Sequence, residues 1–128
     1  MKGRTIVTII AGVLACGLPL WPIPYNQVSL PGNPSVKIWL GLGAMAGALG
    51  GWLLEPKLRR PILAVTLGYM LAVCGRIEVE TSRDPTTHNL APFEVIIAAF
   101  YGFIAACIGV AVAWLVRGFT KRASTEKA

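Results

Sequence analysis

Four long apolar blocks separated by short polar segments form the main pattern of this chain. The blocks are Thr5–Trp21, Lys37–Leu54, Pro61–Ile77 and Phe93–Val116. At 1.5 Å per helical residue, the first three reach roughly 25–27 Å and the fourth about 36 Å, against a hydrocarbon core of about 30 Å. The pattern therefore predicts an all-α, integral membrane four-helix bundle, with residues 1–128 in a single transmembrane domain.

A soluble helix bundle is the main alternative, and its helices would carry polar residues at every third or fourth position. The segment Ile6–Trp21 has no charged residue, and within the last block only Glu94, near its start, is charged. Composition agrees, because 55% of the residues are hydrophobic and 14% are charged. Helices that are apolar on all sides favour a lipid environment.

Basic residues concentrate on one side of the predicted membrane. Of the 12 lysines and arginines, nine fall on the side of the two termini and three on the other. The nine are Lys2, Arg4, Lys57, Arg59, Arg60, Arg117, Lys121, Arg122 and Lys127, and the three are Lys37, Arg76 and Arg83. Because Lys and Arg remain cytoplasmic, we expect both termini inside, with residues 117–128 as a basic cytoplasmic tail. This bias favours a bacterial inner membrane, and the scattered cations give no support for a nucleic-acid partner.

The first block also resembles a lipoprotein signal, because the box Val13–Cys16 follows a basic start and an apolar run. The apolar run continues past Cys16 to Trp21, whereas polar chain normally follows a cleavage site. We therefore expect an uncleaved helix, and processing at Cys16 is the alternative. The three cysteines have no CxxC spacing and indicate neither a disulfide framework nor a zinc site.

The segment GLGAMAGALGG, residues 41–51, holds five glycines in eleven positions. A dinucleotide-binding turn would need a preceding strand and an acidic residue about twenty positions further on. Here a proline-containing loop precedes the glycines, and Ile62 and Leu63 occupy the later position. On a helix, Gly43, Gly47 and Gly51 instead form one stripe, which permits close approach of a neighbouring helix in lipid.

Small residues recur at the same spacing in the other blocks. The predicted helix-packing positions are Gly43, Gly47, Gly51, Gly68, Ala98, Gly102, Ala106 and Gly109. Two uses are open for them. They hold this chain's own bundle together, or they bind a second copy or a partner protein.

Aromatic residues and prolines mark the predicted span ends. Rings are expected at the membrane interfaces. Those at the outer ends are Trp21, Tyr25 and Trp39, and those at the inner ends are Trp52 and Trp114. We expect Pro19 to fray or kink the first helix, Pro31 to form a turn, Pro56 to end the second helix, and Pro61 to lie in the first turn of the third.

The outer segment EVETSRDPTTHNLAP, residues 78–92, is the most polar part of the chain. Asp84 and His88 are weak candidates for metal ligands, since their spacing matches no metal motif, and we interpret the segment as a solvated loop.

Arg76 lies at the outer end of the third block. We expect it to pair with Glu78, Glu80 or Glu94 and so to join the third and fourth helices. An anion or lipid-headgroup site is the alternative.

Function is constrained mainly by exclusion. The chain has no catalytic triad, paired intramembrane carboxylates or HExxH motif, so we expect neither an enzyme nor a cofactor. An accessory or assembly subunit, packed against a larger membrane complex or itself, is the first hypothesis. A homo-oligomeric channel or passive transporter for an anion or small solute, lined by Thr66, Tyr69 and Tyr101, is the second.

Overall fold

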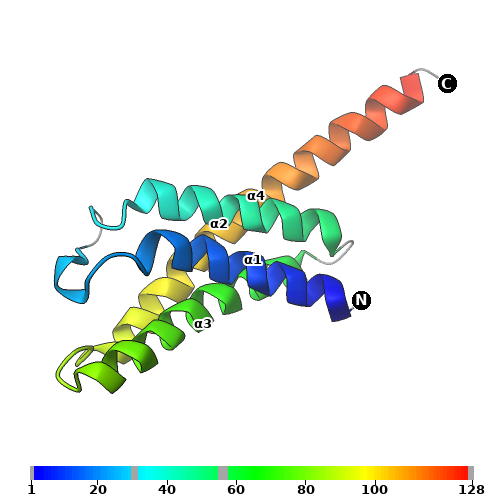
Figure 1. Ribbon diagram of the computed structural model, residues 1–128. Coiled ribbons are helices and arrows are strands. Elements are labelled where there is room, and N and C mark those ends of the chain that lie inside the picture. The colour runs from blue at the N-terminus through cyan, green and yellow to red at the C-terminus, as the bar shows by residue number, and fades with distance from the viewer. Residues whose placement is uncertain (1, 30–31, 55–57, 127–128) are drawn as a thin grey trace.

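The computed structural model describes residues 2–29, 32–54 and 58–126. Its helices are α1 (Lys2–Leu20), α2 (Val36–Leu53), α3 (Arg59–Arg83) and α4 (Ala91–Glu126), with a short 3-10 helix, η1 (Tyr25–Gln27), after α1. In Figure 1 both ends of the chain lie toward the right, and the α1–α2 and α3–α4 connections lie toward the left. We call this second end, where the candidate site lies, the pocket end.

The prediction of an all-helical chain with four membrane-spanning candidates is confirmed. All four helices are long and apolar enough to cross a membrane. Large apolar side chains are exposed on each of them, as lipid-facing helices require. Examples are Ile10 on α1, Met45 on α2, Leu63 on α3 and Phe103 on α4.

Two helices extend beyond their apolar blocks. α3 continues through the charged residues to Arg83, and α4 continues past Val116 to Glu126. The first half of the segment 78–92 is therefore helical rather than loop. Pro19 lies inside the last turn of α1, and Pro61 lies near the start of α3. Pro31, Glu55, Pro56, Lys57 and Lys127 lie outside the described residues.

The helices associate mainly as two pairs, α1 with α3 and α2 with α4. Glycines allow the two helices of each pair to approach closely. A Cβ on Gly47 of α2 would lie 2.8 Å from the Cα and the carbonyl oxygen of Ala106 on α4. A Cβ on Gly68 of α3 would lie 2.5 Å from the carbonyl oxygen of Ile9 on α1. Close backbone approach across small residues supplies much of the packing energy between helices in lipid.

A hydrogen-bonded cluster in the core connects three helices. Tyr69 on α3 donates its hydroxyl to the carbonyl oxygen of Trp39 on α2, 2.5 Å away. The indole of Trp39 donates in turn to the carbonyl oxygen of Cys16 on α1, at 3.2 Å. Trp39 is only 2% exposed, so its ring is not an exposed anchor at the start of α2. Its ring is a core element that packs 5.6 Å from the Tyr69 ring.

Candidate functional site

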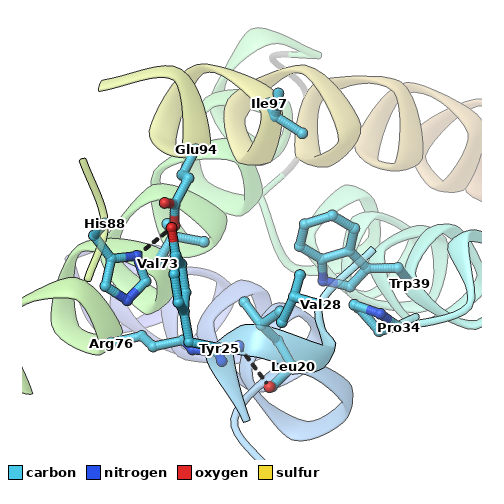
Figure 2. Close-up of a pocket in the computed structure, with 10 residues that line it drawn as sticks. All are labelled: Leu20, Tyr25, Val28, Pro34, Trp39, Val73, Arg76, His88, Glu94 and Ile97. Carbon is cyan, nitrogen blue, oxygen red and sulfur yellow. Dashed lines mark hydrogen bonds and ion pairs between the residues drawn. The ribbon is translucent and has the colours of Figure 1, made fainter. Parts of the chain in front are cut away.

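A pocket of about 430 Å³ opens at the pocket end, where α1 ends, α2 begins, α3 ends and α4 begins (Figure 2). Its walls are largely apolar, with three ionisable groups on one side. The lining residues are Leu20, Tyr25, Val28, Pro34, Trp39, Val73, Arg76, His88, Glu94 and Ile97. This composition, apolar with a few polar groups, is typical of small-molecule sites.

Arg76 is the buried cation of the site, with a relative exposure of 5%. Its Nη1 donates to the carbonyl oxygen of Leu20 at 2.8 Å and its Nη2 to that of Ile23 at 2.6 Å. The last carbonyls of a helix have no intrahelical donor, and Leu20 is the last residue of α1. Arg76 therefore caps α1 and holds the chain that follows it against α3.

Glu80 accepts a third hydrogen bond from the guanidinium. The Nε of Arg76 lies 2.9 Å from the Oε1 of Glu80, one helical turn further along α3. Residues four apart lie on one face of a helix, so the pair forms within α3. The ion pair compensates the buried positive charge and leaves the second oxygen of Glu80 for another partner.

His88 connects the two ends of the α3–α4 loop. Its Nε2 contacts the Oε2 of Glu80, and its Nδ1 lies 2.7 Å from the Oε2 of Glu94, in the first turn of α4. The His88 side chain is only 1% exposed. Its backbone has a φ of 57°, in the left-handed region that residues other than glycine seldom adopt. The Tyr25 ring covers the imidazole, with the centroids 4.2 Å apart.

The four side chains make one continuous network, Arg76–Glu80–His88–Glu94. Of the carboxylates expected beside Arg76, only Glu80 contacts it directly, and Glu94 is reached through His88. Glu78 lies exposed on another face of α3. The α3–α4 loop is not uniformly solvated, because His88 is a buried part of this network.

Asp84 lies apart from the network, exposed at the end of α3. Hydrogen bonds from the side chain and then the backbone of Thr86 lower the pKa of its carboxyl. Within the described residues, no three histidine, cysteine or acidic side chains are arranged to hold a metal ion. Asp84 and His88 are therefore not brought together as ligands.

The predicted packing residues lie on the inner faces of the helices. Gly43, Gly47 and Gly51 face α4, where Gly109 meets the backbone of α2 at Ala44 and Ala48. Gly68 faces α1, and Gly102 faces the ring of Tyr69. Ala98 and Ala106 have no exposed surface.

The three residues proposed for a pore lie inside the bundle or are partly covered. Tyr69 is fully buried and bonded to Trp39, as described above. The hydroxyl of Thr66 donates to the carbonyl oxygen of Ile62 in its own helix, at 2.8 Å. Tyr101 is half-buried, with its ring 5.4 Å from that of Trp39.

Sequence reasoning did not find Tyr25, Pro34 and Trp39 as part of a site. For Trp39 a signal was present. It lies four residues before Gly43, so it belongs to the same inward stripe as Gly47 and Gly51. Tyr25 and Pro34 come from a loop, whose path no helical periodicity specifies.

No family model, curated protein or solved structure matches this chain.

Proposed function

We propose that this chain is an accessory or assembly subunit that acts by contact within a membrane, against a larger complex or a second copy of itself. In this proposal both termini are cytoplasmic, the membrane is a bacterial inner membrane, and the pocket end faces outward. The charge bias supports this orientation, because nine of the 12 basic residues precede the first apolar block, follow the last one, or separate the second from the third in the sequence.

The observation that carries the proposal is the free end of α4. Arg117 is tied to α2, since its Nη2 donates to the carbonyl oxygen of Trp52 at 2.7 Å and its guanidinium lies over the Trp52 ring. Every residue from Gly118 to Glu126 is helical and exposed. Figure 1 shows this part of α4 extending beyond the other helices. We call residues 118–126 the α4 arm.

The α4 arm has the composition of a contact surface. Phe119 is 69% exposed, and Lys121 and Arg122 follow it within one turn. Isolated helices shorter than about 12–15 residues are marginal in water, so the arm depends on α4 and on whatever it contacts. A solvent-exposed aromatic residue beside cations fits a protein partner that supplies an apolar groove with acidic residues.

The interior of the bundle gives no support for an ion or solute path through a single chain. The small residues pack the chain's own helices together, and the hydroxyl groups of Thr66 and Tyr69 are hydrogen-bonded within the bundle. A conducting path would need surfaces from a second copy. An ion or solute pathway is therefore an outcome that the experiment has to test.

The experiment is purification of the tagged full-length protein from its native membrane in mild detergent, followed by mass measurement. We expect a complex of fixed stoichiometry that Phe119→Ala weakens and that Phe100→Ala leaves intact. Phe100 is a matched control, because it is 60% exposed on the same helix but lies outside the α4 arm, in the part of α4 that packs against the other helices.

Reconstitution of the purified protein in liposomes distinguishes the second hypothesis. The proposal expects no ion or solute flux above that of empty liposomes. A defined homo-oligomer that conducts, or a complex indifferent to Phe119→Ala, would contradict it.

A further inference from the structure

The pocket has separate apolar and charged walls. Trp39 and Ile97 lie across the cavity from the His88 ring in Figure 2, and the Glu94 carboxylate lies beside that ring. Its volume of about 430 Å³ falls in the range of small-ligand sites, about 300–1,000 Å³. A ligand that fits therefore has an apolar body and a single polar or charged head.

The contacts of His88 join two carboxylates in the charged wall. Both of its ring nitrogens lie against carboxylate oxygens, of Glu80 and Glu94. The wall therefore holds two carboxylates beside one guanidinium and one imidazole.

An anionic head meets two carboxylates in this wall. Three of the five N–H groups of Arg76, one on each nitrogen, already donate to protein oxygens, and the residue is only 5% exposed. A cationic head finds Glu94, whose side chain is 29% exposed and whose Oε1 has no donor within the described part of the chain. The rings of Tyr25 and Trp39 also line the cavity, and aromatic faces attract organic cations.

We propose that this pocket binds a lipophilic organic cation, such as an aromatic amine or a quaternary ammonium compound, with Glu94 as its counter-charge. The cation pairs with the Oε1 of Glu94, while the Oε2 keeps its contact with His88. Binding neither forms nor breaks a covalent bond.

The probe is benzyltrimethylammonium, whose charge does not change with pH, titrated calorimetrically into the full-length protein in detergent. Neopentylbenzene is the neutral molecule of the same shape. We expect one site and at least tenfold weaker binding of the neutral compound.

Variants locate the site. Glu94→Gln should weaken cation binding at least tenfold, whereas Glu78→Gln, which changes an exposed carboxylate on α3, should leave it unchanged. Ile97→Trp fills the apolar side without touching the network and should also prevent binding, which keeps the test valid if Glu94→Gln does not fold. Equal binding of neopentylbenzene, preference for benzenesulfonate, or wild-type binding by folded Glu94→Gln would overturn the proposal.

Discussion

The guanidinium of Arg76 on α3 donates from Nη1 to the carbonyl oxygen of Leu20, the last residue of α1, at 2.8 Å. One side chain thereby completes the end of another helix. The same group is paired with Glu80, which contacts His88 from the loop before α4. The pocket end of the bundle is consequently held by one polar network rather than by packing alone.

Replacing Arg76 tests this role. Arg76→Ala removes three hydrogen bonds of a charged donor and leaves the Leu20 and Ile23 carbonyls with fewer partners. Hydrogen bonds to charged groups are worth about 1.5–3 kcal/mol each in net terms, and water entering at the pocket end replaces some of them. We expect the unfolding free energy to fall by about 2–3 kcal/mol.

Unfolding of detergent-solubilised protein, followed by circular dichroism, gives this value. Arg83→Ala is the control, because Arg83 is exposed at the end of the same helix. Equal stability of the two variants would show that the Arg76 network contributes nothing to the fold.

The close contact between α2 and α4 predicts different effects on stability when two glycines of α2 are replaced by alanine. Gly47→Ala places a methyl group 2.8 Å from the backbone of Ala106, so the helices have to separate. Gly41→Ala meets nothing within 4 Å. We expect Gly47→Ala to destabilise the bundle by about 1–3 kcal/mol and Gly41→Ala to be neutral or stabilising by a few tenths of a kcal/mol. The same unfolding assay measures both variants. A Gly47→Ala protein as stable as Gly41→Ala would contradict the close approach of α2 and α4 at Gly47.

The low pKa of Asp84 predicts a contribution to acid sensitivity. Its folded-state pKa lies below the ordinary value because Thr86 donates hydrogen bonds to the carboxylate. The carboxylate therefore stabilises the fold above its unfolded pKa, and this stabilisation is lost as pH falls through the folded pKa. We expect the stability of Asp84→Asn to decline less than that of wild type below about pH 4. Glu78→Gln is the exposed control, and identical pH profiles for Asp84→Asn and wild type would exclude the effect.

The apolar blocks were sufficient to predict the four helices but not where α3 ends. Hydropathy locates the part of a helix that suits lipid, whereas backbone hydrogen bonding and local pairs decide where the helix stops. The Arg76–Glu80 pair, one turn apart, lies within helix that continues to Arg83. The charged residues after Ile77 therefore end the apolar block without ending the helix.

The candidate site was predictable only in part. Arg76 stood out because a cation at the end of an apolar block needs a partner, and Glu80 was within reach of it. His88 gave no such signal. Its burial depends on Tyr25, Glu80 and Glu94, which come from three separate segments, so no local pattern indicates it.

Trp39 shows a conflict between two rules. Aromatic residues near span ends are typical of membrane interfaces, whereas the four-residue spacing to Gly43 indicates an inward position. The inward position is the one observed, and it allows the indole to donate to Cys16 on α1.

The central claim is that the four helices cross a membrane with both ends of the chain on one side and the pocket on the other. Its most direct test is labelling by a membrane-impermeant maleimide in spheroplasts of a bacterial host. The chain carries alanine at its three cysteine positions and one new cysteine, either Ser82→Cys near the pocket or Ser124→Cys in the α4 arm. Both serines are exposed. We predict that Ser82→Cys is labelled on intact spheroplasts and that Ser124→Cys is labelled only after lysis. Labelling of Ser124→Cys without lysis would contradict the claim.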